Sequence, residues 1–182
     1  MNMNAYTRLT NEFQACVTDE DLIQIGCTFG LVNPNDFFKW KVTMIGPQDT
    51  PYAGGLFKII VEFPKDYPSH GPEFIFENKI YHLNVNFTSN PHFKQGHICL
   101  NSLNEWKVTG HVKEQPNFGV KQALFEIFCL FYNQGTEGPY DTNMAELYKN
   151  NPQQFNENVK KWVKDYAMLN NNSFNNNFNN NC

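Results

Sequence analysis

Five cysteines are the side chains of this sequence best suited to covalent chemistry, and they are spread along the whole chain. Their odd number, their wide spacing and the lack of a Cys-x-x-Cys pair argue against a disulfide framework and against a structural zinc site. A cysteine thiolate is a strong nucleophile and a good leaving group, so it can accept an acyl group and pass it to an amine. Each cysteine therefore has to be considered on its own, as an acyl carrier or as a packing residue.

Cys99 is the strongest candidate for an acyl carrier, although composition alone favours its burial. It lies between two aliphatic residues, and most free cysteines pack in protein interiors. Its place in a polar stretch after Gly96 and His97 favours an accessible thiol instead. Three other cysteines lie on apolar faces of expected helices or strands and are predicted to pack in the core, while the fifth ends the chain without an evident role: Cys16, Cys27 and Cys129, then Cys182.

Hydrophobic periodicity predicts a mixed α/β fold that begins with a helix and continues with four strands. Apolar residues recur every three or four positions over 9–17, which predicts an N-terminal helix. Alternation starts after Asp21 and predicts a first strand containing Ile23, Ile25, Cys27 and Phe29, followed by strands over 37–42, 56–63 and 74–76. Short turns join these strands, so we expect an antiparallel meander with the first helix covering one face.

The segment 78–119 has a different character, because it is rich in Asn, Gly, His and Pro and shows little periodicity. Long irregular segments in compact domains are usually functional. Helices are predicted beyond it over 120–131, 142–149 and 152–166, with Thr142 as a cap and Pro152 in a first turn. We expect residues 1–169 to form one domain and the Asn-rich residues 170–182 to be disordered.

Composition narrows the classes of function. The formal net charge is −4 and no run of Lys or Arg exceeds two, which argues against nucleic acid or an anionic membrane as the main partner. No stretch approaches the roughly 18 consecutive apolar residues of a membrane span, and the first residues lack the apolar core of a signal peptide. We therefore expect a soluble protein of the cytoplasm, the nucleus or both.

The irregular segment contains two motifs, IYHLNVN and GHICLNSLNEW, and the strand region before it reads MIGPQDTPYAGGLFKIIVEFPKDYP. In this order, and with Trp106, these segments resemble the ubiquitin-conjugating enzymes over about Tyr6 to Ala167. That family has a His-Pro-Asn triplet shortly before its catalytic cysteine and a Trp shortly after it. The resemblance implies a UBC-like fold and an acyltransferase in which Cys99 carries ubiquitin, or a related modifier, as a thioester.

Asn84 is the second candidate site residue. Aminolysis of a thioester builds negative charge on the carbonyl oxygen, and an Asn amide N–H is a suitable donor to it. The resemblance also implies that this Asn holds the active-site loop, so stabiliser and scaffold both stay open, and Asn is in any case common in turns. His82 is expected to brace the loop by hydrogen bonds rather than to shuttle protons.

The sequence departs from the family pattern at several positions of the motifs. Leu83 replaces the Pro of the triplet, which removes a fixed φ but no reactive group. Asn101 stands where many members have Asp. The family's Asp-Pro-Leu, whose acid helps to position the incoming lysine, falls on residues 138–140, which are Gly-Pro-Tyr. Glu137 or Asp141 is a neighbouring carboxylate that could substitute for that acid.

Further departures lengthen or alter the loops around the site. The loop between Asn84 and Cys99, which contains FTSNPHFKQ, is longer than is usual in the family, and a second insertion, KVTGHVKEQPN, follows Trp106. Many members dock ligases through a Phe after their Tyr-Pro and a Ser-Pro-Ala segment after the Trp. Here Ser69 and residues 107–109 occupy those places, so any ligase partner is expected to be of an atypical kind.

Three functional interpretations remain. The first is a ubiquitin-conjugating enzyme that works with an activating enzyme and a ligase, and that needs no cofactor or metal because ATP is used by the activating enzyme. The second is a conjugating enzyme for another modifier, of the NEDD8 or SUMO type, which Cys-Leu-Asn at residues 99–101 favours and the GPQDTPYAGG segment does not. The third is a non-catalytic binding module, which the presence of Cys99 and Asn84 makes the weakest.

Overall fold

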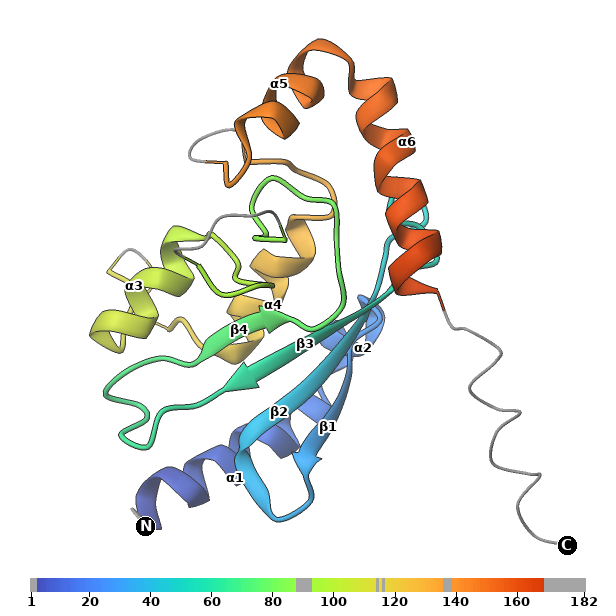
Figure 1. Ribbon diagram of the computed structural model, residues 1–182. Helices are drawn as coiled ribbons and strands as arrows, with labels where there is room; N and C mark the ends of the chain where they lie inside the picture. Colours follow the sequence, from blue (N-terminus) through green and yellow to red (C-terminus); the bar gives the residue numbers. More distant parts are fainter. Residues whose placement is uncertain (1–2, 88–92, 114, 116, 136–138, 169–182) are drawn as a thin grey trace, which may run out of the picture.

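Four strands and the helices around them form an α/β structure, shown as a computed structural model in Figure 1. Residues 3–87, 93–113, 115, 117–135 and 139–168 are described by the structure. The strands are β1 (Thr28–Asn33), β2 (Asp36–Ile45), β3 (Leu56–Glu62) and β4 (Glu73–Phe76), all antiparallel and paired in chain order. The predicted meander is therefore confirmed.

The register between β2 and β3 separates the two faces of the sheet. Trp40 lies opposite Val61, and Met44 lies opposite Phe57, and all four side chains are buried. The other face of these strands includes charged side chains, as in the pair of Lys39 with Glu62. This alternation with period two is what fixes which side of the sheet receives the helices.

The inner face is covered by α1 (Met3–Val17) and α4 (Val120–Cys129), which also contact each other. Phe13 of α1 meets Trp40 of the sheet edge to face, with ring centroids 5.1 Å apart. Leu124 of α4 is fully buried in the same core. The first helix thus covers one face, as predicted, and Ile98, the neighbour of Cys99, is buried in the same core.

The first strand was expected to start near Asp21, and this prediction is wrong. Residues Glu20–Gln24 instead form a short helix, α2. Asp19 caps this helix by accepting a hydrogen bond from the backbone N–H of Leu22 at 3.1 Å, and two acidic residues favour its first turn. Leu22 is buried and Ile23 is 55% exposed, which is the reverse of what the predicted strand required. The capped helix is therefore favoured over the strand that the alternating pattern predicted.

The segment 78–119 is irregular up to Leu100, and then contains a helix that the sequence did not predict. This helix, α3 (Asn101–Thr109), buries only Leu103 and Trp106 and has no side-chain cap at its start. Its weak amphipathic pattern explains why periodicity alone missed it. The helix begins two residues after Cys99 and therefore fixes where the chain leaves the candidate site.

Two helices close the described chain, α5 (Thr142–Asn150) and α6 (Pro152–Trp162), and a π-helical turn, η1 (Val163–Ala167), continues the latter. Pro152 opens α6 as predicted, but Thr142 does not cap α5: Asp141 does, by accepting from the N–H of Met144 at 3.0 Å. Figure 1 shows α5 beyond one end of the sheet and α6 running back from it toward the strands. No helix in the described ranges has the length and apolar content needed to cross a bilayer.

The cysteines differ in burial. Cys16 and Cys27 are buried in the core, and burial raises the pKa of each thiol to about 12, so both stay protonated. Cys129 was also predicted to pack in the core, and this prediction is wrong because the residue is exposed at the end of α4. The predicted disordered tail at 170–182, including Cys182, lies outside the described residues.

Candidate active site

Cys99 lies in an irregular segment that is tied to the loop before it. A β-bridge joins Val85 to Ile98, and the backbone N–H of Cys99 donates to the carbonyl oxygen of Asn84 at 2.7 Å. The cysteine is partly exposed, whereas Cys16 and Cys27 are buried. Of these thiols, Cys99 is the one held by fixed backbone contacts beside polar groups while still open to solvent.

Asn84 lies next to Cys99, and its side chain is held from two sides. Its Oδ1 accepts a hydrogen bond from the backbone N–H of Gly135 at 2.8 Å, and its Nδ2 points to the carbonyl oxygen of Cys99 at 3.5 Å. The residue is only 5% exposed. In this arrangement the amide connects the segment of Cys99 to the loop after α4.

His82 braces the same loop from within the protein. Its Nε2 donates to the carbonyl oxygen of Leu130 at 2.8 Å, and its Nδ1 accepts from the N–H of Asn84 at 2.9 Å. Burial lowers the pKa of this imidazole to about 4, which keeps it neutral, and the two bonds place its proton on Nε2. These contacts agree with the expected bracing role of His82.

Tyr140 and His97 also reach the candidate site, and sequence reasoning did not single them out. The Tyr140 hydroxyl is hydrogen-bonded to His97 Nδ1, and His97 lies two residues before Cys99 in the chain. Phe93 packs against both rings, at 5.1 Å from Tyr140 and 5.4 Å from His97 between centroids. The available signal was Tyr140 itself, which stands where the family has Leu.

The remaining predicted residues lie apart from this group or outside the described ranges. Asn101 is exposed in the first turn of α3. Asp141 uses one carboxylate oxygen to cap α5, while Glu137 lies outside the described residues. Within the described ranges, no group of three or more His, Cys, Asp or Glu side chains is placed to hold a metal ion.

The described part of the second insertion packs against the loop between β3 and β4. Gly110 ends α3 with φ 74°, and a Cβ at this position would lie 2.3 Å from the carbonyl oxygen of Ser69. Val112 is buried, and the N–H of Lys113 donates to a carboxylate oxygen of Glu105 at 2.9 Å. This insertion is therefore a built part of the surface beside Ser69.

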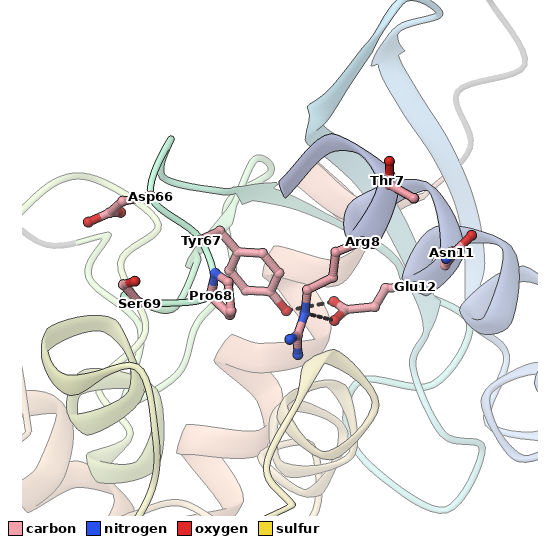
Figure 2. A pocket seen from close by; sticks show the side chains of 8 residues that line it. All are labelled: Thr7, Arg8, Asn11, Glu12, Asp66, Tyr67, Pro68 and Ser69. Carbon is pink, nitrogen blue, oxygen red and sulfur yellow. Dashed lines mark hydrogen bonds and ion pairs between the residues drawn. The ribbon is translucent and has the colours of Figure 1, made fainter. Parts of the chain in front are cut away.

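A pocket of about 680 Å³ lies between α1 and the loop that contains Ser69, and Figure 2 shows its lining. Glu12 connects its two sides, because it accepts from Arg8 Nε at 2.7 Å and from the Tyr67 hydroxyl at 2.6 Å. The Arg8 guanidinium also lies 5.4 Å from the centre of the Tyr67 ring. With Ser69 exposed at its edge, the pocket presents polar and charged groups rather than an aromatic anchor.

Comparison of the sequence and the fold with known proteins identifies the family of this chain. The family model of the ubiquitin-conjugating enzymes matches residues 8–163, which include the sheet, the site and most of the helices. This chain belongs to the ubiquitin-conjugating enzyme family. Members of this family are acyl-transferring enzymes, and the α/β architecture described above is the one the resemblance of the motifs implied.

Individual relatives are similar over nearly the whole chain. The Arabidopsis thaliana protein named "Probable ubiquitin-conjugating enzyme E2 31" is 31% identical over 167 residues, which cover 92% of this chain and 96% of that protein. A solved ubiquitin conjugating enzyme domain from Toxoplasma gondii has a TM-score of 0.70 at 28% identity, over 90% of this chain and 99% of its own. The "Crystal structure of a putative ubiquitin conjugating enzyme from Plasmodium yoelii" has a TM-score of 0.73 at 29% identity, over 92% of this chain and 98% of its own.

Proposed function

We propose that this protein accepts ubiquitin from an activating enzyme as a thioester on Cys99 and transfers it to an amine, normally a lysine of a substrate. The observation that carries this proposal is the position of Cys99, a partly exposed thiol whose backbone is bonded to Asn84 within a braced loop. A carrier thiol must be reachable by two large partners in turn, yet must present its acyl group in one orientation. Buried thiols such as Cys16 and Cys27 do not meet the first requirement.

The proposed reaction has two acyl transfers. In loading, the Cys99 thiolate attacks the thioester carbonyl on the activating enzyme, a new C–S bond forms, and the thiolate of that enzyme leaves. In discharge, an amine nitrogen attacks the carbonyl carbon, the C–N bond forms, and the Cys99 sulfur leaves with the electron pair of the C–S bond. The amine gives its proton to solvent, and the Asn84 amide donates to the transient oxyanion.

The proposed partners follow from this reaction. They are the modifier, an activating enzyme that uses ATP, and a ligase that brings the substrate, so the chain itself needs no cofactor. We propose ubiquitin as the modifier because the segment GPQDTPYAGG is typical of the ubiquitin branch, while Asn101 favours a NEDD8-type modifier as the second candidate. The proposed location is the cytoplasm, the nucleus or both, where that enzyme system operates.

The test is a charging assay with activating enzyme, ATP and each candidate modifier in turn, analysed on a non-reducing gel. The expected product is one adduct with ubiquitin that disappears when reductant is added. Cys99→Ser should give at most an adduct that resists reductant, because an oxygen ester replaces the thioester. Cys129→Ser is the matched control, since it removes an exposed thiol from another place and should charge normally. Normal charging of Cys99→Ala would refute the assignment.

A further inference from the structure

Three aromatic rings gather on the face of the candidate site that carries Cys99. Ile98 is buried, whereas His97 and Cys99 on either side of it are partly exposed. Successive side chains of extended backbone point to opposite sides, and His97 and Ile98 each form a β-bridge. The side chains of His97 and Cys99 therefore lie on one face. The Tyr140 hydroxyl is hydrogen-bonded to His97 Nδ1, and Phe93 packs on both of these rings.

The ring of Tyr140 lies across the segment that separates its backbone from that of Cys99. The Tyr140 N–H donates to the carbonyl oxygen of Leu83 at 3.2 Å, and the Cys99 N–H donates to that of Asn84 at 2.7 Å. The two residues are thus attached to consecutive carbonyl groups. Because the Tyr140 hydroxyl still reaches His97, the phenol ring crosses this segment on the face where a thioester on Cys99 would form.

Phe93 completes the cluster and leaves part of its ring in solvent. The residue is 45% exposed, and its ring centroid lies 5.1 Å from that of Tyr140 and 5.4 Å from that of His97. Its backbone is fixed from within by the buried Asn86. The Nδ2 of Asn86 donates to the carbonyl oxygen of Phe93 at 2.8 Å, and its backbone N–H donates to that of His97 at 2.9 Å. The exposed part of the Phe93 ring is therefore held in a set place near Cys99.

A cluster of rings beside a carrier thiol suits an apolar group, and the proposed reaction brings one to it. The amine of a lysine ends a methylene chain, and the methylene groups nearest the nitrogen must pass beside Cys99 when the amine attacks. Contact with the rings removes these groups from water, which is favourable. The resemblance implies a carboxylate at residue 138 to position the lysine, and Gly stands there. An apolar contact with the chain can position the amine without that charge.

We propose that Phe93, supported by Tyr140 and His97, forms an aromatic wall that binds the methylene chain of the acceptor lysine. Phe93 is then a specificity-determining residue that favours primary amines on long apolar chains. The proposal rests on the proposed carrier function of Cys99 and deepens it by naming the class of acceptor. The wall contacts the chain rather than the reacting nitrogen, so it changes which amine is used and not the intrinsic reactivity of the thioester.

The first test compares two amines that share one reacting group and differ in their chain. The charged enzyme is discharged in single turnover to butylamine and to methylamine at equal concentrations, and the ratio of the two rates is measured. The wild type should react faster with butylamine. In Phe93→Ala the ratio should fall about fourfold, the effect of burying one methylene group. The methylamine rate itself should not change, because methylamine has no chain for the wall to bind.

Two further variants separate the ring from general effects. Phe93→Leu keeps an apolar side chain in the wall and should retain most of the preference for butylamine. Tyr166→Ala is the matched control, since it removes a ring that is 44% exposed in η1 and should leave the ratio unchanged. An unchanged ratio in Phe93→Ala would overturn the proposal. Equal slowing of both amines would also overturn it, because the ring would then act on the thioester rather than on the chain.

The second test needs no modifier. Methyl and butyl methanethiosulfonate each react when the Cys99 thiolate attacks the alkylthio sulfur, a disulfide forms and methanesulfinate leaves. Mass spectrometry of the digested chain gives the butyl-to-methyl rate ratio at Cys99 and at the exposed Cys129, which is the internal reference. Phe93→Ala should lower the ratio at Cys99, again by about fourfold, and leave the ratio at Cys129 unchanged.

The two proposals fail differently in these experiments. If no modifier forms a thioester on wild-type Cys99, the carrier function is wrong. If charging is normal but Phe93→Ala keeps the wild-type butyl-to-methyl ratio at Cys99, the aromatic wall alone is wrong.

Discussion

Replacing Asn84 by alanine should weaken both the fold around the site and the transfer step, and the contacts assign a size to each effect. The backbone N–H of Gly135 would lose its acceptor in a region where Asn84 is 5% exposed, which costs about 1–3 kcal/mol of unfolding free energy. Loss of one oxyanion donor costs a further ~10²–10³ in rate. Asn84→Ala should therefore charge but discharge very slowly.

Asn84→Asp separates the two roles, because a carboxylate oxygen can still accept from Gly135 while the amide donor is gone. We expect its discharge to be as slow as that of Asn84→Ala. Asn78→Ala is the matched control, since Asn78 also bonds to backbone, at Lys58 N and Leu56 O, in a different part of the molecule. It should lower stability without slowing discharge.

The assay is single-turnover discharge of the purified charged enzyme to free lysine, at a temperature well below each variant's melting temperature. Loading is measured separately with excess activating enzyme, and thermal unfolding gives the stability change. Wild-type discharge by Asn84→Asp would refute the donor role. Equal slowing of loading and discharge in both Asn84 variants would instead assign Asn84 a purely structural function.

Two more predictions concern the surroundings of the site. Gly135→Ala should slow discharge at least several-fold, because the new Cβ would lie 2.6 Å from Asn84 Nδ2 and displace the amide. Gly30→Ala is the control and should not slow discharge, because a Cβ there would have nothing within 4 Å. Equal discharge rates of the two variants would contradict this prediction. Generic RING ligases should stimulate discharge weakly, because Ser69 offers them no apolar anchor. Ser69→Phe should raise the affinity of these ligases by up to about thirtyfold, or 2 kcal/mol. Strong stimulation of the wild type by several such ligases would oppose that prediction.

The sheet and the main helices were predictable because their signals are local. Residues of β2 alternate between buried and outward positions, and this period of two can be read from the sequence without a partner strand. The prediction of the first strand was wrong because the same apolar residues near Ile23 also fit a short helix. The alternating pattern does not take into account the capping side chain of Asp19. Short elements are decided by one or two such contacts.

The candidate site was predictable in part, for a related reason. Cys99 and Asn84 lie in motifs, so the resemblance identified them before any geometry was available. Tyr140 lies 43 residues after His97 in the sequence, and their contact depends on how the chain returns from α4 to the site. No periodicity reports such a contact, because it is set by tertiary packing rather than by neighbours in the sequence.

The geometry also connects two departures from the family that looked independent in the sequence. The longer loop before Cys99 is held where Asn86 Nδ2 donates to the carbonyl oxygen of Phe93 at 2.8 Å, so its C-terminal part is fixed against the site. Phe93 then packs on His97 and on Tyr140, which occupies the place of the family's Leu. The loop thus supplies an aromatic support for the phenol, and shortening it should release Tyr140 from the orientation in which its hydroxyl meets His97 Nδ1.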